Sequence, residues 1–195
     1  MLHDDAMDAL FRQARSQNGF LDQPVAPETL RALYELMKFG PTSANCSPLR
    51  VVFLTSQEAK LKLLPALSPG NVDKVMSAPV VAVLAHDLRF FRHAQQLFPH
   101  RPEMFDMFAQ NEELARTTAF RNGTLQAAYL MMAARALGLD CGPMSGFDEP
   151  AVQRLFFSSD DAVRVNFLCN LGFGEPAKVF PRLPRLPFDQ ACTIQ

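Results

Sequence analysis

Residues 39–53 read FGPTSANCSPLRVVF and join an apolar helical pattern to a β-branched strand pattern. Pro41 and Pro48 bracket six small or polar residues between the two patterns. Because proline fixes its own φ and disfavours helical geometry in the residue before it, this connection is expected to be stiff. Its hydroxyl and amide side chains are then available to a ligand that lies flat against the loop. The same features suit an ordinary link between a helix and a strand, so the choice depends on the rest of the chain.

The patterns on either side of this loop predict both helices and strands. Helical periodicity covers 4–16, 27–40, 57–64, 112–137 and 148–157, and strand patterns cover 51–55, 78–85 and 163–171. The pattern over 78–85 is a continuous apolar run, which is typical of a strand covered on both faces, and 163–171 is expected to be another buried strand. A central sheet is therefore expected.

The longer helices are expected to bury one apolar face each. In the helix over 27–40 this face consists of Leu30, Leu33, Tyr34, Leu36 and Met37, and in the helix over 112–137 it consists of Leu125, Ala128, Tyr129, Met132, Ala133 and Ala136. In the short helix over 57–64, Leu61 and Leu64 are expected to point inward. Asp4 or Asp5 is the expected N-cap of the first helix, and Gly40 and Gly138 are expected to end the second and the long helix.

Composition excludes several classes of protein. The 195 residues are 48% apolar and 20% charged with a formal net charge of −1, which predicts one large globular domain or two small ones, without a basic surface for nucleic acid. The four cysteines are widely spaced and predict reduced thiols and no metal site. Neither a signal peptide nor an apolar run of about 20 residues is recognisable, so we expect a cytoplasmic protein without a membrane segment.

Two polar clusters are candidates for ligand binding. Arg15, Ser16 and Asn18 precede Gly19 and could clamp a phosphate, or Arg15 could be a solvated charge in the last turn of a helix. Asn71 and Lys74 follow a Pro-Gly turn and are three residues apart on one face of a predicted helix.

Two segments rich in glycine or proline follow. Residues 139–148, LDCGPMSGFD, predict a loop whose glycines allow the backbone to approach a ligand closely. Residues 181–188, PRLPRLPF, predict an extended segment that lies over another surface, or else an unstructured tail. Between these motifs, residues 89–111 contain five phenylalanines, which is too many for a solvated loop, so they are expected to line a pocket or a subunit contact.

The order of these five motifs resembles the FMN-dependent nitroreductase family over nearly the whole length. The runs GPTSANCSP, LGLDCGPMSGFD and RLPRL are most similar to the branch that reduces malonic semialdehyde in pyrimidine degradation. The resemblance implies a single α+β domain over residues 1–195, a three-layer sandwich in which helices flank a central mixed, mostly antiparallel sheet. It also implies an intertwined homodimer with FMN at the subunit interface and an extended tail, residues 181–195, that reaches the partner.

The resemblance further implies a set of cofactor-binding residues. These are Arg15, Ser16, Asn18, Pro41, Thr42, Ser43, Asn45, Asn71, Lys74, Pro143, Met144, Ser145, Gly146, Arg182 and Arg185. The loop after Pro41 would line the flavin ring from the partner subunit, with Ser43 and Asn45 as donors. Asn71 and Lys74 would stabilise the negative charge of the reduced ring, and a backbone N–H in 144–146 would face N5. Ala14 and Asn18 replace basic residues of the family, so phosphate neutralisation falls to Arg15 and the tail arginines.

The implied reaction passes hydride from NADH or NADPH through flavin N5 to a small aldehyde acid, malonic semialdehyde, and yields 3-hydroxypropionate. No side-chain nucleophile is needed for this chemistry. A small-molecule substrate with a carboxylate requires a cation, for which Arg121 and Arg50 are candidates unless both are solvated charges. A broad nitro or quinone reductase and a non-catalytic flavin-binding protein are the alternatives.

Overall fold

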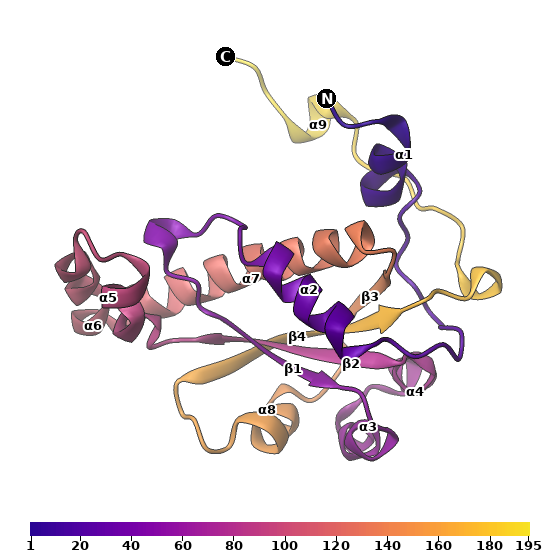
Figure 1. Cartoon of the computed structure of the whole chain (residues 1–195), viewed down its shortest axis with the longest axis horizontal. Coiled ribbons are helices and arrows are strands. Elements are labelled where there is room, and N and C mark those ends of the chain that lie inside the picture. The colour runs from indigo at the N-terminus through magenta and orange to yellow at the C-terminus, as the bar shows by residue number, and fades with distance from the viewer.

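A four-stranded sheet in the order β1-β2-β4-β3 lies at the centre of the computed structural model, which describes residues 1–195 (Figure 1). The strands are β1 Leu49–Leu54, β2 Val80–Asp87, β3 Asp140–Met144 and β4 Val163–Gly172. All three pairings are antiparallel. The only parallel pairing is an isolated bridge between Ser16 and Cys141, beside β3.

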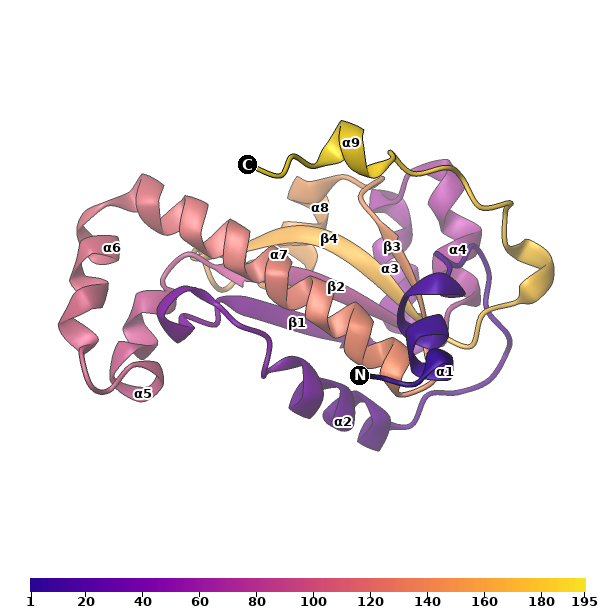
Figure 2. The ribbon, with the colours of Figure 1, turned by 90° about the horizontal axis from the view of Figure 1, so that it is seen from above.

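Helices cover both faces of this sheet. They are α1 Asp4–Met7, α2 Pro27–Met37, α3 Gln57–Leu63, α4 Val72–Ser77, α5 Ala94–Leu97, α6 Asp106–Gln110, α7 Glu112–Ala136, α8 Glu149–Phe157 and α9 Phe188–Ala191. Figure 1 shows α2 and α7 above the sheet and α3, α4 and α8 below it, and Figure 2 shows α7 lying across the strands. The expected three-layer sandwich is confirmed.

The apolar run of β2 explains why this strand is central. Val81 and Val83 belong to the hydrophobic core between the sheet and helices α3 and α8. Ala82 and Leu84 belong to the core between the sheet and helices α2 and α7. Successive side chains of a strand point to opposite faces, so a strand covered on both sides must be apolar throughout. All eight residues of β2 are buried. The prediction of a covered strand is confirmed.

Local signals fix several helix ends as expected. Pro27 occupies the first turn of α2, and the Asp148 carboxylate accepts a hydrogen bond from the Ala151 N–H at 2.9 Å at the start of α8. Gly138, with φ of 77°, follows the end of α7.

The first helix and Gly40 differ from the prediction. The helical segment ends in a π-helical turn at Arg12 rather than at Ser16, and His3 is its N-cap residue, without a side-chain capping bond. Gly40 has no left-handed φ, because its role is packing: a Cβ there would lie 2.6 Å from the Tyr129 ring.

The predicted apolar face of α7 is mostly wrong, because it is exposed rather than buried. Leu125 is 46% exposed and Tyr129 is 42% exposed. The buried face instead carries Ala115, Thr118, Ala119, Asn122, Gly123, Gln126, Ala127, Leu130, Ala133 and Ala134. Small residues are needed there because the helix lies close to the sheet: a Cβ on Gly123 would lie 2.8 Å from the Cβ of His86.

Two other helices show smaller differences of the same kind. In α2, Leu30, Leu33 and Met37 are buried as expected, but Tyr34 and Leu36 are exposed. In α3 the buried side chains are those of Lys60 and Leu63, whereas Leu61 is exposed. The Lys60 ammonium donates a 2.9 Å hydrogen bond to the Ala78 carbonyl, which satisfies the buried charge.

The phenylalanine-rich segment forms a core of its own. Phe90, Phe105 and Phe108 are buried with Cys46 beside the N-terminal part of α7. Phe90 and Phe108 make an edge-to-face contact with ring centroids 5.0 Å apart. For these three side chains the prediction of a pocket or a subunit contact is wrong, since they pack on one another. None of the helices combines the length and the apolar composition that a membrane crossing requires.

Candidate functional site

The segment around Arg15 lies along β3. The Gln17 N–H donates a hydrogen bond to the Cys141 carbonyl at 2.9 Å, and Ser16 forms a parallel bridge with Cys141. Gly142 permits this approach, because a Cβ there would lie 2.8 Å from the Gln17 carbonyl oxygen. The motif around Arg15 and the motif over residues 139–148 are therefore neighbours in space.

The end of β3 meets the turn before α4. The Asn71 amide donates a hydrogen bond to the Gly146 carbonyl at 2.9 Å, and the Ser68 N–H donates to the same oxygen at 3.0 Å. A Cβ on Gly146 would lie 2.7 Å from Nδ2 of Asn71, so glycine preserves this contact. Lys74 follows one turn later and is half-buried.

The segment 139–148 is not the continuous loop that its composition predicts. Asp140 to Met144 form β3, which pairs with β4, and only Ser145 to Asp148 connect this strand to α8. The strand includes Pro143, which has no N–H to donate. This is tolerated because β3 is an edge strand with only one neighbour.

The tail crosses the N-terminal segment and gathers cations there. The Arg15 guanidinium donates to the Phe180 carbonyl, and Arg182 donates to the carbonyls of Arg12 at 2.7 Å and Ala14 at 3.1 Å. Beyond this crossing the tail lies outside the sandwich (Figure 1). Arg185 turns back on its own segment and donates to the Leu183 carbonyl at 2.9 Å.

Lys178 is a residue of this cluster that sequence reasoning missed. Its side chain lies over Gly19, where a Cβ would be 2.2 Å from Cδ of the lysine, and its carbonyl accepts a 3.4 Å hydrogen bond from the Asn18 amide. Its ammonium is paired with Glu175 at 2.8 Å. Nothing in the local sequence indicates this contact, because it depends on a backbone bond between Glu175 and Gly19.

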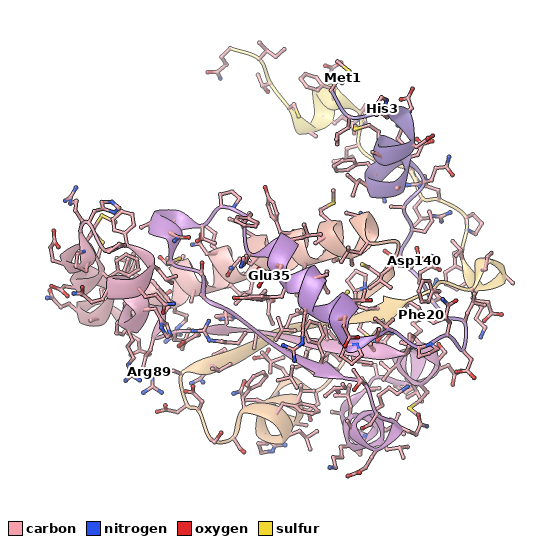
Figure 3. All side chains as sticks on the ribbon, in the orientation of Figure 1. Met1, His3, Phe20, Glu35, Arg89 and Asp140 are labelled. Carbon is pink, nitrogen blue, oxygen red and sulfur yellow. The ribbon has the colours of Figure 1, made fainter.

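The loop from Pro41 to Pro48 lies at the other end of the sheet. The Asp87 N–H donates to the Pro48 carbonyl at 2.9 Å, so the loop adjoins the C-terminal end of β2, about 20 Å along the strand from its start. In Figure 3 the labelled Arg89 marks this end, and Phe20 and Asp140 mark the opposite one. A single chain therefore does not bring the loop to the other motifs.

The backbone of this loop is strained at three residues. Ala44, Asn45 and Ser47 have left-handed φ values of 49°, 55° and 40°. Each costs about 1 to 2 kcal/mol in a residue other than glycine. The side chains are not all available to a ligand, because the Asn45 amide donates to the Leu97 carbonyl at 2.9 Å and the Thr42 hydroxyl accepts from the Ser47 N–H at 3.2 Å.

The two candidate substrate cations have different surroundings. Arg50 forms an ion pair with Asp87 at 2.7 Å and donates to the Leu49 carbonyl at 2.9 Å. Arg121 is exposed on α7 and makes neither an ion pair nor a hydrogen bond within the chain. It lines a depression of about 430 Å³ together with Thr117, Phe120, Thr124, Leu125 and Ala128.

A groove between α2 and β1 has a volume of about 1090 Å³. Leu33, Tyr34 and Phe39 line it from the α2 side, and Leu49, Val51 and Phe53 line it from β1. Sequence reasoning missed this groove. It exists because β1 is an edge strand whose outer side has no neighbour.

The statistical model of the Nitroreductase family matches residues 11–173 of the chain. This match contains every segment of the candidate site except the tail. The chain belongs to the nitroreductase family. The family and the fold expected from the sequence are thereby confirmed.

Relatives match this nitroreductase almost from end to end. HadB of Ralstonia pickettii, which carries the provisional name NADH dehydrogenase/NAD(P)H nitroreductase, is 58% identical over 191 residues, or 97% of each chain. A protein of Cupriavidus pinatubonensis with the same provisional name is 56% identical over 196 residues, or 100% of each chain.

Solved structures agree with this family membership. YdfN of Bacillus subtilis, provisionally named a nitroreductase, has a TM-score of 0.86 at 26% identity and covers 99% of this chain and 100% of its own. A protein of Exiguobacterium sibiricum in complex with FMN has a TM-score of 0.88 at 19% identity over 100% of this chain and 99% of its own. The second likeness is one of fold alone.

Two buried groups of this nitroreductase have strongly displaced pKa values. Burial raises the pKa of the Cys46 thiol from 9.0 to about 11, so the thiol is not a nucleophile at neutral pH. Burial lowers the pKa of His86 from 6.5 to about 4, and the positive charge of Arg164 adds to this effect while Asp87 opposes it. His86 is therefore neutral at pH 7, and its Nδ1 is buried without a hydrogen-bond partner.

Proposed function

We propose that this nitroreductase binds FMN and passes hydride from NADH or NADPH to a small organic acceptor. The observation that supports this most directly is the meeting of residues 15–18, 71–74 and 143–146 along β3 and its continuation. These segments are far apart in the sequence, and each carries polar side chains or glycine. The relatives named for NAD(P)H and the neighbour that binds FMN support the same proposal.

The residues present suit the two chemically different ends of FMN. At one end, Arg15 and Arg182 lie where the tail crosses the N-terminal segment. A guanidinium group can donate two parallel hydrogen bonds to the oxygens of one phosphate, so this end fits a phosphate. At the other end, the amide of Asn71 and the charge of Lys74 fit the polar edge of a flat ring. Gly146 has no side chain that would collide with the Asn71 amide.

FMN bound there would supply hydride transfer between the nicotinamide and the acceptor. The chain contributes orientation and electrostatic stabilisation. Asn71 is held by the Gly146 carbonyl, so its position is fixed before a ligand arrives. Lys74 provides a positive charge that favours negative charge on an adjacent group, and its effect is larger in a site that excludes water.

The replacement Lys74→Met is expected to lower the midpoint potential of the bound flavin and to slow its reduction by NADPH. Loss of one partly buried charge contact is worth about 1 to 3 kcal/mol, which corresponds to about 20 to 60 mV for a two-electron couple. A redox titration of the purified protein measures this shift, and Lys74→Arg is the control that keeps the charge. An unchanged potential in Lys74→Met would remove Lys74 from the site.

We also propose that the protein is a homodimer in which each site is shared between two chains. The loop after Pro41 is remote from the other motifs of its own chain. We therefore infer that the loop of a second chain completes the FMN site. Large apolar side chains are exposed on the surfaces that a second copy would cover, on α7 and α2, namely Leu114, Phe120, Leu125, Tyr129, Tyr34, Leu36 and Phe39. Patches of this kind mark protein interfaces.

The partner's tail is the proposed occupant of the groove between α2 and β1. Within its own chain the tail leaves Leu183, Leu186 and Phe188 exposed. The groove presents an unpaired strand edge and an apolar wall of matching character. An extended segment can lie against such an edge and bury alternate side chains.

For the acceptor we propose malonic semialdehyde, which would be reduced to 3-hydroxypropionate. Its support is the similarity of the runs GPTSANCSP, LGLDCGPMSGFD and RLPRL to the branch that acts on this compound. The carboxylate of a small oxo acid needs a cation. Arg121 is favoured over Arg50 for this role, because Asp87 already neutralises Arg50.

The names of the relatives favour a second candidate, a nitroreductase of broad specificity. A panel of acceptors decides between the two: the consumption of NADPH and of NADH is measured with malonic semialdehyde, nitrofurazone and a quinone. We expect the highest kcat/KM for malonic semialdehyde, and a comparable or higher value for nitrofurazone would favour the second candidate.

A protein that oxidises neither nucleotide although it carries FMN would be a flavin-binding protein. A protein that gains no flavin absorbance after incubation with FMN would overturn the proposal.

A further inference from the structure

Two amide side chains on the buried face of α7 reach the loop between Pro41 and Pro48. Asn122 is 1% exposed and Gln126 is 5% exposed. They are four residues apart, so both lie on the same face of the helix. The amide oxygen of Asn122 accepts a hydrogen bond from the Ser43 N–H at 2.8 Å, and that of Gln126 accepts from the Leu49 N–H at 2.9 Å. The two bonds therefore hold the two ends of the loop.

These amides are unusual on a face that otherwise consists mainly of small and apolar residues. A polar group costs free energy when it is buried unless a partner is in place. Asn122 is satisfied on both sides, because its amide nitrogen donates to the Thr118 carbonyl at 2.8 Å. This bond also orients the side chain, so that its oxygen faces Ser43. The arrangement fixes a backbone group of the loop to a rigid helix.

The loop requires such restraint. Its backbone is left-handed at Ala44, Asn45 and Ser47, and conformations of this kind persist in residues other than glycine only where the surroundings enforce them. Between the two amide contacts, Cys46 is buried in the phenylalanine core. The two amides bind on either side of Cys46, at Ser43 and at Leu49.

We propose that Asn122 and Gln126 are positioning residues that set how the loop from Pro41 to Pro48 is presented to the cofactor of the partner subunit. Neither residue is placed at the cofactor itself. Their effect passes through the backbone at Ser43 and Leu49. The last step, the contact between the loop and FMN, rests on the proposed function.

The test combines two readouts on the full-length protein. Hydrogen exchange of the Ser43 and Leu49 amides reports the tethers themselves, and FMN titration of the apoprotein reports their consequence. In Asn122→Leu the Ser43 amide is expected to exchange about tenfold faster, and in Gln126→Leu the Leu49 amide likewise. In each variant the Kd for FMN is expected to rise about three- to tenfold, because a smaller fraction of the loops is then competent to bind.

Two further variants separate positioning from general destabilisation. Leu130→Ala removes a fully buried side chain from the same helix without touching the loop, so exchange at Ser43 and the Kd for FMN are expected to stay within about twofold of wild type. Gln126→Met keeps the length of the side chain but has no oxygen to accept from the Leu49 N–H, so it is expected to lose as much FMN affinity as Gln126→Leu. If either leucine variant fails to fold, Asn122→Ala and Gln126→Ala are measured in the same way.

Each other outcome is decisive. Faster exchange with unchanged FMN affinity would overturn the positioning role and leave FMN binding intact. An equal loss of affinity in Leu130→Ala, or wild-type affinity in Gln126→Met, would also overturn it. A wild-type protein that binds no FMN would overturn the proposed function and the role of the loop together, which distinguishes the two failures.

Discussion

Removal of residues 181–195 is expected to give a monomer whose affinity for FMN is at least about a hundredfold lower. Leu183 is 74% exposed within its own chain, and Leu186 and Phe188 are similarly open. Burial in the partner's groove would stabilise the dimer by about 1.5 to 3 kcal/mol for each such side chain, and tenfold in affinity corresponds to about 1.4 kcal/mol. The deletion also removes Arg182 from the proposed phosphate end. Sedimentation velocity and FMN titration of the same sample measure both losses.

The single replacement Arg185→Ala serves as the control for this deletion. It removes one cation and no apolar side chain, so FMN affinity is expected to fall while the dimer persists. Arg182→Ala removes the hydrogen bonds to the carbonyls of Arg12 and Ala14 and shows which of the two arginines serves the phosphate. A truncated chain that still sediments as a flavin-loaded dimer would show that the tail has neither role.

Acid is expected to destabilise the protein through His86. The pKa of this side chain is about 4 in the folded chain, and its ordinary value is 6.5. Between these two values the unfolded chain binds a proton that the folded chain does not, so the free energy of unfolding falls as the pH falls from about 6.5 to about 4. At 1.36 kcal/mol per pKa unit the full loss is about 3 kcal/mol. Above pH 6.5 both states are neutral at this position and the contribution vanishes.

Urea unfolding of wild type and of His86→Phe over this pH range tests the prediction. The phenyl ring keeps the Cβ that packs on Gly123 and the edge contact with Phe120, and it removes the titrating nitrogens. The difference between the two proteins isolates His86 from the carboxylates that also titrate in acid. Parallel curves for the two proteins between pH 6.5 and 4 would contradict the assignment.

The sequence predicted those parts of the fold that depend on local signals. The apolar run identified β2, because a strand covered on both faces is apolar along most of its length. Pro27, Asp148 and Gly138 marked helix ends because capping depends on a few neighbouring residues. The order of the polar motifs pointed to the family for the same reason: each motif is short and continuous.

The sequence predicted least well which face of a helix is buried, because this depends on the element that packs against the helix. α7 lies between the sheet and an open apolar surface, so its large residues face outward and its small ones face the sheet. Periodicity alone cannot tell these two faces apart. Composition predicted a loop where β3 forms, because it does not reveal that an edge strand tolerates Pro143. The contact of Lys178 with Gly19 and the amide tethers of the loop depend on the folded chain and have no local signature.

The loop after Pro41 and the residues around Lys74 lie at opposite ends of the chain's sheet, and this separation has a genetic consequence for the proposed dimer. One allele damaged at Ser43 and another damaged at Lys74 would each encode an inactive protein. In a mixed dimer, however, one site collects both lesions and the other contains neither. Random pairing of equal amounts leaves about a quarter of all sites intact. Two defective alleles can therefore complement each other, although neither encodes a working chain.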